Sequence, residues 1–142
     1  MMPFTYEYPR AALTVDALVF SMDIKHILLV QRSMPPFKDQ WALPGGFVGM
    51  DETLEEAVSR ELEEETGLRR VELNQFHAFS AIDRDPRHRT ISVVFYALID
   101  HTLTQVHGGD DASDARWFNM NDLPVLAFDH DEIIALAAKE LK

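Results

Sequence analysis

The sequence predicts an α/β domain in which a central mixed sheet packs against two main helices. Three observations support this fold class: several strand-like apolar segments, an acid-rich segment with helical periodicity in the middle of the chain, and a second amphipathic segment at its C-terminal end. The chain has 142 residues, 46% of them hydrophobic, which suits one domain with its own core. No repeat or long linker divides it, so residues 1–142 are predicted to form a single domain.

The predicted strands are recognised by alternating or continuous apolar residues. They are residues 11–20, 26–32, 71–81, 90–99 and 116–119. In the first of them, four residues spaced two apart share one face: Leu13, Val15, Ala17 and Val19. Prolines and glycines predict a loop at residues 33–46, and residues 129–142 have the apolar spacing of a closing helix. His130, at the start of that helix, is expected to be a structural hydrogen-bonding residue.

Residues 53–67 have the sequence signals of a second helix. Thr53 and Glu56 fit a capping box at its start, and Gly67 suits the left-handed position after its end. At about 100° per residue, four apolar side chains fall on the stripe that should face the sheet: Leu54, Ala57, Val58 and Leu62. The same phase turns three glutamates to the opposite, solvated side: Glu52, Glu56 and Glu63.

Acidic residues also occupy the apolar stripe of this helix. Glu61 and Glu65 lie on it, and Glu64 lies at its edge beside Arg60. Carboxylates turned toward a core are costly unless they are paired or ligated. Magnesium and manganese take hard oxygen ligands, so the cluster predicts an Mg²⁺ or Mn²⁺ site. The alternative is an ion-pair network with Arg60 and other bases.

The charge of the chain limits its partners. The net charge is −11, and the segment from Asp51 to Glu65 carries eight acids and one base. Duplex nucleic acid and anionic membranes are therefore not expected partners, whereas a small anionic substrate remains possible if a cation intervenes. The chain has no cysteine, and no segment has the length of an apolar membrane span or the pattern of a signal peptide. A cytoplasmic protein is expected.

Residues 46–68, GFVGMDETLEEAVSRELEEETGL, resemble the Nudix box, G-x5-E-x7-R-E-U-x-E-E-x-G-U, where U is aliphatic. Every fixed position is filled, by Gly46, Glu52, Arg60, Glu61, Leu62, Glu64, Glu65, Gly67 and Leu68. The resemblance implies a Nudix α/β/α sandwich with a catalytic helix in the box. It also implies hydrolysis of a nucleoside diphosphate linked to another group.

The resemblance assigns roles within the box. Glu61, Glu64 and Glu65 would be metal ligands, and Arg60 would orient the glutamates. The backbone of two small residues, Gly45 and Gly46, would bring a carbonyl to the metal. Glu52 would support the metal or the structure, although the helical phase places it outside.

The resemblance extends over most of the chain at lower specificity. The segments TVDALVF, WALPGGFV, DRDPR, DDASDARWF and LAFDH look like the Nudix group that contains ADP-ribose pyrophosphatases and the Nudix-like sensor domains of NrtR-type regulators. ADP-ribose, cleaved to AMP and ribose 5-phosphate, is the substrate expected from this likeness. Arginines interleaved with aspartates in residues 83–89 are either phosphate or ribose contacts or self-paired residues of a surface hairpin. They are Arg84, Arg87 and Arg89.

Two further features bear on catalysis and assembly. The general base is expected to be Glu61 or an acid of a later loop, and the loop is favoured because a metal-bound carboxylate is a weak base. The loop candidates are Asp110, Asp111 and Asp114. At the N-terminus Phe4, Tyr6 and Tyr8 alternate along an extended segment. They could stack on the adenine, form a homodimer contact, or pack in the core.

Three hypotheses follow for the function. The leading one is a metal-dependent ADP-ribose pyrophosphatase. A MutT-like nucleoside triphosphate pyrophosphohydrolase is the alternative within the enzyme class, and a ligand sensor without catalysis is the alternative from another class. Against the sensor, the box is intact and no residues follow Lys142 to form a winged-helix domain.

Overall fold

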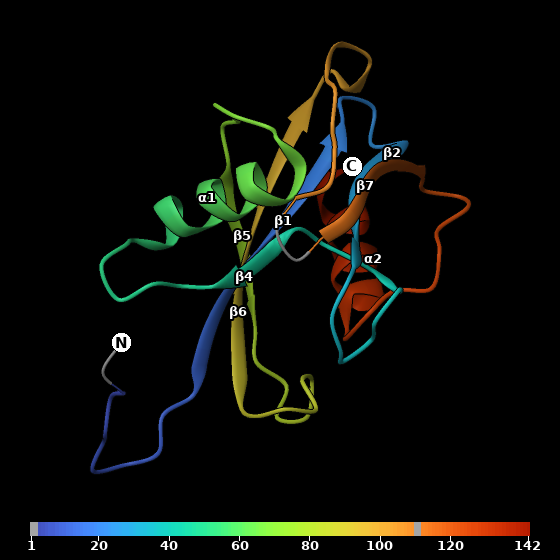
Figure 1. Ribbon diagram of the computed structural model, residues 1–142. Coiled ribbons are helices and arrows are strands. Elements are labelled where there is room, and N and C mark those ends of the chain that lie inside the picture. The colour runs from blue at the N-terminus through green and yellow to red at the C-terminus, as the bar shows by residue number, and fades with distance from the viewer. Residues whose placement is uncertain (1–2, 110–111) are drawn as a thin grey trace.

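The computed structural model describes residues 3–109 and 112–142 (Figure 1). In chain order its elements are β1 (Ala12–Ser21), β2 (His26–Arg32), β3 (Trp41–Ala42), β4 (Gly45–Phe47), α1 (Leu54–Thr66), β5 (Asn74–Phe79), β6 (Thr90–Ile99), the 3₁₀ helix η1 (His101–Leu103), β7 (Ala112–Asn119) and α2 (His130–Leu141). The predicted α/β class is confirmed. No helix in the described part of the chain is long and apolar enough to span a membrane.

The strands form one mixed sheet in the order β3-β2-β1-β6-β5, with β4 pairing with β1 and β7 pairing with β2. β1 and β6 run parallel over ten residues, and the other pairs are antiparallel. On the side away from β6, β1 changes its partner along its length. Its first half pairs with β4 at Thr14–Asp16, and its end pairs with β2 at Phe20. β4 is thereby held beside the middle of β1, where it meets α1.

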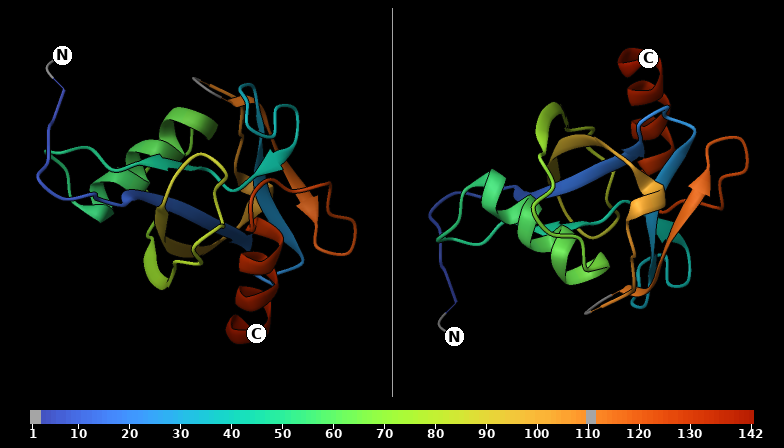
Figure 2. Two further views of the ribbon diagram at one scale, coloured as in Figure 1. Left: turned by 90° about the horizontal axis from the view of Figure 1, so that it is seen from below. Right: turned by 90° about the horizontal axis from the view of Figure 1, so that it is seen from above.

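The two helices cover opposite faces of β1. Val15, Ala17 and Val19 pack in one core cluster with Ala57, Val58 and Leu62 of α1. Leu18 and Phe20, which alternate with them, pack in a second cluster with Ile133 and Ile134 of α2. Figure 2 shows the helices on either side of the sheet. The predicted inward faces of β1 and α1 are confirmed, except that Leu13 is 40% exposed.

The predicted limits of α1 are also confirmed. Thr53 accepts a hydrogen bond from the Glu56 N–H, and the Glu56 carboxylate accepts one from the Thr53 N–H, which completes the capping box. Gly67 has a φ of 82° and its N–H donates to the Glu63 carbonyl. This left-handed conformation, for which glycine is suited, ends the helix and fixes the orientation of its last turn.

Three parts of the chain differ from the sequence prediction. β7 begins at Ala112 rather than Arg116, so Asp114 lies on a strand and not in the predicted polar loop. The short strands β3 and β4 were predicted as loop, because two or three residues among prolines and glycines carry no periodic signal. The alternative that the N-terminal aromatic residues pack in the core is wrong. Phe4, Tyr6 and Tyr8 are 41–72% exposed, on a segment that runs outward from the start of β1 (Figure 1).

Candidate active site

A cavity of about 480 Å³ opens between β4, the start of α2 and the β5–β6 loop. This volume lies in the range of sites that bind small-molecule ligands. β4 contributes Gly45 and Gly46 to its wall, and α1 contributes Arg60, Glu61 and Glu65. The sheet contributes Thr14 and Asp16, and the β5–β6 loop contributes Arg84, Asp85 and Arg87. Seven of the predicted site residues therefore line one cavity, whereas Glu64 does not belong to its described wall.

The carboxylates of Glu61 and Glu65 in α1 lie directly against the glycine backbone of β4. The Gly45 N–H donates to Glu65 Oε2 over 2.8 Å, and Glu65 is buried. A β-carbon on Gly46 would lie only 2.5 Å from Glu61 Oε1. The predicted inward direction of Glu61 and Glu65 is confirmed. Glycine at position 46 leaves the space that a β-carbon would fill to the Glu61 carboxylate.

Arg60 gathers three carboxylates around its guanidinium. It donates to both oxygens of Glu52 over 2.6 and 2.9 Å, to Glu61 over 2.8 Å and to Glu64 over 3.1 Å. A further bond to the Phe47 carbonyl ties this group to β4. The helical-phase prediction for Glu52 is wrong: the residue precedes α1, and its loop turns the carboxylate back onto Arg60. The Arg60 hydrogen bond lowers the pKa of Glu52 to about 2.

Glu63 and Glu64 occupy different environments although they are neighbours. Both are exposed, but Glu64 contacts Arg60, whereas Glu63 pairs with the exposed Arg69 over 2.8 Å. Burial raises the pKa of Glu61, and the hydrogen bond from Arg60 opposes that effect. The carboxylates nearest the cavity thus outnumber the single guanidinium between them.

The described residues fit a hard divalent cation by their chemistry. The β4–α1 junction offers carboxylate and backbone oxygens, a glycine cradle without β-carbons, and an excess of negative charge. No group of three or more His, Asp or Glu side chains within residues 3–109 and 112–142 is arranged to hold a metal ion. In this arrangement Glu61 and Glu64 engage Arg60 instead. The metal ligands Gly45, Gly46, Glu61, Glu64 and Glu65 stay a prediction.

The arginines of the β5–β6 loop are paired with acids. Arg84, with a side chain only 4% exposed, makes a two-pronged contact with Asp129 over 2.7 and 2.9 Å. Arg87 pairs with Asp85 over 2.8 Å and lies 5.5 Å from the ring centres of Phe47 and Phe128. Arg84 therefore ties the loop to the start of α2, and Arg87 is the more accessible of the two to a ligand.

The remaining predicted site residues lie away from the cavity or outside the described residues. Arg89 bonds the Ala81 carbonyl, and Tyr8 is exposed on the N-terminal segment. Neither belongs to the described wall of the cavity. Asp114 pairs with Arg116 over 2.8 Å and is likewise not part of that wall. Asp110 and Asp111 lie outside the residues that the structure describes, so their role stays a prediction.

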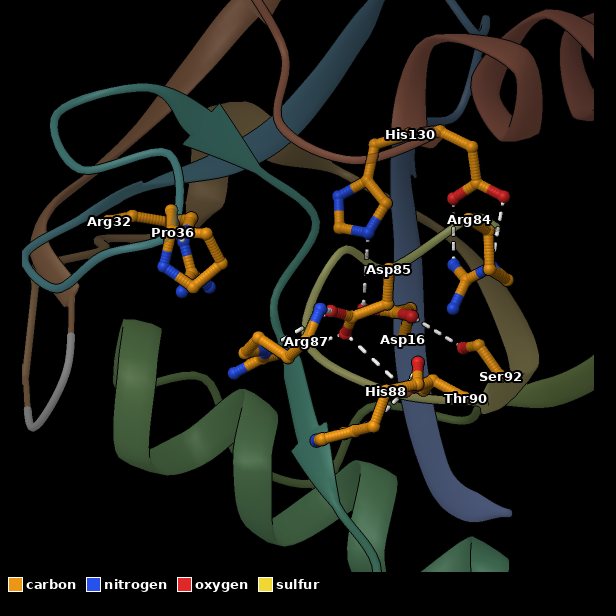
Figure 3. A network of polar contacts seen from close by, with 11 residues as sticks. Asp16, Arg32, Pro36, Arg84, Asp85, Arg87, His88, Thr90, Ser92 and His130 are labelled. Atoms are coloured by element: carbon orange, nitrogen blue, oxygen red, sulfur yellow. Dashed lines mark hydrogen bonds and ion pairs between the residues drawn. The ribbon is translucent and has the colours of Figure 1, made fainter. Parts of the chain in front are cut away.

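A buried polar group on the cavity floor was missed by the sequence analysis (Figure 3). Asp16 accepts a hydrogen bond from Ser92, and burial raises its pKa to about 7. The Leu43 N–H donates to His130 Nδ1 over 3.0 Å, which confirms the structural role expected for His130. Burial lowers the pKa of His130 to about 3. One signal was available, since Asp16 is the one charged residue in a predicted strand of mostly apolar residues.

This fold and site define a Nudix hydrolase. The NUDIX domain family matches residues 10–137, and the chain belongs to that family.

One relative and two solved structures show which members of the family this chain is similar to. An ADP-ribose pyrophosphatase of Methanocaldococcus jannaschii is 47% identical over 127 residues, which cover 89% of this chain and 73% of the relative. Among solved structures, the NUDIX domain of Shewanella oneidensis NrtR complexed with ADP ribose has a TM-score of 0.87 and 34% identity, covering 95% of this chain and 91% of that one. A bifunctional NMN adenylyltransferase/ADP ribose pyrophosphatase of Francisella tularensis, complexed with AMP and a Mn ion, has a TM-score of 0.84 and 35% identity. The match covers 96% of this chain and 44% of that one.

Proposed function

We propose that the protein hydrolyses the pyrophosphate bond of ADP-ribose and releases AMP and ribose 5-phosphate. The observation that carries the proposal is the cavity where Glu61 and Glu65 meet the bare backbone of Gly45 and Gly46. The 47% identity to an ADP-ribose pyrophosphatase and the likeness to a domain complexed with ADP ribose support this choice of substrate. The reaction adds water across a phosphoanhydride bond, so two phosphate monoesters form.

Glu61, Glu64 and Glu65, with a carbonyl from Gly45 or Gly46, would hold Mg²⁺ or Mn²⁺. Such a cation, when bound, withdraws negative charge from a diphosphate and acidifies an attacking water. The carboxylates must then stay close together despite their mutual repulsion. Arg60 supports this arrangement because it contacts three carboxylates at once and is itself tied to the Phe47 carbonyl.

The other residues of the cavity would bind and orient the substrate. Arg87 is placed to contact a phosphate, since its guanidinium lies at the wall and two aromatic rings limit its movement. Arg84 would act indirectly by fixing the loop to Asp129. For the general base, Asp110 and Asp111 remain candidates beside Glu61. Asp114 is less suited because Arg116 already engages it.

The proposal also covers the cellular location, the ligand and the assembly of the protein. We place it in the cytoplasm with a small nucleotide as the ligand. The exposed aromatic segment around Phe4, Tyr6 and Tyr8 would suit a homodimer contact.

The proposal is tested by incubating the purified protein with ADP-ribose and Mg²⁺ and separating the products chromatographically. AMP and ribose 5-phosphate should appear in equal amounts, stop in excess EDTA, and return with added Mg²⁺ or Mn²⁺. Full turnover in excess EDTA would remove the basis for the metal site. Tight binding of ADP-ribose without turnover would favour the sensor hypothesis instead.

A further inference from the structure

Polar atoms of two buried side chains face each other across the floor of the cavity without forming a hydrogen bond. His130 Nε2 lies 3.8 Å from Asp16 Oδ1, and the two side chains are only 5% and 9% exposed. Both residues line the cavity. Figure 3 shows Asp16 between His130 and Ser92. We refer to these two residues as the Asp16–His130 pair.

The neighbouring hydrogen bonds decide which atom is the donor. His130 Nδ1 accepts from the Leu43 N–H, so in the neutral imidazole the proton is on Nε2, which faces Asp16. Asp16 Oδ2 accepts from the Ser92 hydroxyl, whereas the described residues provide no hydrogen bond to Oδ1. The pair thus presents one donor and one acceptor side by side, and polar groups this deeply buried normally have partners.

We propose that the Asp16–His130 pair recognises one hydroxyl group of the sugar beyond the second phosphate of the substrate. A hydroxyl is donor and acceptor at once. Its oxygen would accept from His130 Nε2–H and donate its own proton to Asp16 Oδ1. Atoms 3.8 Å apart can both lie about 2.8 Å from one such oxygen. This inference rests on the proposed function and adds two specificity-determining residues to it.

The same pair disfavours a phosphate at that position. The terminal phosphate of a nucleoside triphosphate brings acceptor oxygens and negative charge, so the ionised form of Asp16 would receive no hydrogen at Oδ1 and would face a like charge. A site built to bond a hydroxyl discriminates strongly against ligands that lack it. The pair therefore provides a physical reason for preferring a sugar-linked diphosphate over a triphosphate.

The test compares kcat/KM for ADP-ribose with that for the methyl ester of ADP, which keeps the diphosphate and lacks the sugar. The wild type should prefer ADP-ribose by at least about tenfold. Asp16→Ala should abolish most of that preference through a higher KM for ADP-ribose. Asp16→Asn should stay within about threefold of the wild-type preference, because its amide can donate to Ser92 and leave an oxygen in the Oδ1 position. Ser92→Ala is the matched control and should affect both substrates alike.

Several results would overturn the inference. In Asp16→Ala, an equal loss for both substrates would mean that Asp16 only supports the neighbouring Gly45 backbone, and an unchanged preference would mean that the pair holds only water. Asp16→Asn behaving like Asp16→Ala would point to charge rather than hydroxyl recognition. If Asp16→Ala does not fold, wild-type kinetics with analogues lacking one hydroxyl of the distal ribose decide. One such analogue should lose at least about tenfold in kcat/KM, and no loss for any of them contradicts the inference. Failure of the wild type to cleave ADP-ribose at all would instead refute the proposed function.

Discussion

Replacing Gly46 by alanine should separate catalysis from folding at this site. The added β-carbon would lie 2.5 Å from Glu61 Oε1, 2.6 Å from its Cδ and 2.8 Å from its Oε2. Ordinary contact begins near 3.4 Å, so the carboxylate must retreat by about 0.9 Å. Because Glu61 is the end of a flexible side chain and position 46 has no left-handed backbone, we expect the free energy of unfolding to fall by less than about 1 kcal/mol.

The effect on the reaction should be much larger than the effect on stability. A displacement of about 1 Å at a catalytic group costs roughly a hundredfold in rate, or about 2.7 kcal/mol of transition-state stabilisation. The assay is steady-state hydrolysis of ADP-ribose in saturating Mg²⁺, with urea unfolding of the same samples.

Gly49→Ala is the control for the Gly46 substitution. Its β-carbon would lie 3.1 Å from Glu52 Oε1, a milder contact farther from the cavity. This variant should keep kcat/KM within about threefold. Wild-type kcat/KM in Gly46→Ala would refute the claim that the Glu61 position against β4 matters for the reaction.

The other predictions concern the carboxylates and the buried histidine. Glu64→Gln should cut kcat by orders of magnitude with the fold intact, whereas Glu63→Gln, whose partner is a surface arginine, should be nearly silent; equal losses would contradict the assignment. Arg60→Lys should lower kcat at least about tenfold, because one ammonium cannot replace a guanidinium that contacts three carboxylates, and wild-type kcat would count against that role. The depressed pKa of His130 means that its contribution to stability is present above pH 6.5 and is lost as pH falls toward 3. The raised pKa of Asp16 has the opposite effect, because its contribution to stability falls as the pH rises from 3.8 to 7. Comparing the pH dependence of urea unfolding between His130→Gln and the wild type therefore isolates the contribution of the histidine. An unchanged slope in the variant would refute the assignment.

Local sequence signals were sufficient for most elements of the fold. The ranges of β2 and β6 coincide with the predicted strands, because long apolar runs specify strands by themselves. The ends of α1 were predictable because capping by Thr53, Glu56 and Gly67 depends only on neighbouring residues. The strands β3 and β4 were not predictable from local signals, because they form by pairing with β2 and β1 and their own residues carry no strand pattern.

The candidate site likewise contains residues that local sequence signals predict and contacts that only the folded chain brings together. Glu61 and Glu65 could be assigned because both lie on one helix, where spacing gives direction. Their contacts with the glycine backbone of β4 could not be predicted from the sequence. The pairing of Arg84 with Asp129, 45 residues away, could not be predicted either. The Asp16–His130 pair joins β1 to α2 across 114 positions of the sequence, and only the folded chain brings it to the cavity floor.

The most direct test of the account is a competition between ADP-ribose and a nucleoside triphosphate in one reaction with Mg²⁺, followed by mass spectrometry of the products. AMP and ribose 5-phosphate should be the main products, with a kcat/KM for ADP-ribose at least about tenfold above that for the triphosphate. Release of pyrophosphate with a tenfold preference for the triphosphate would contradict the proposed function and establish the MutT-like alternative.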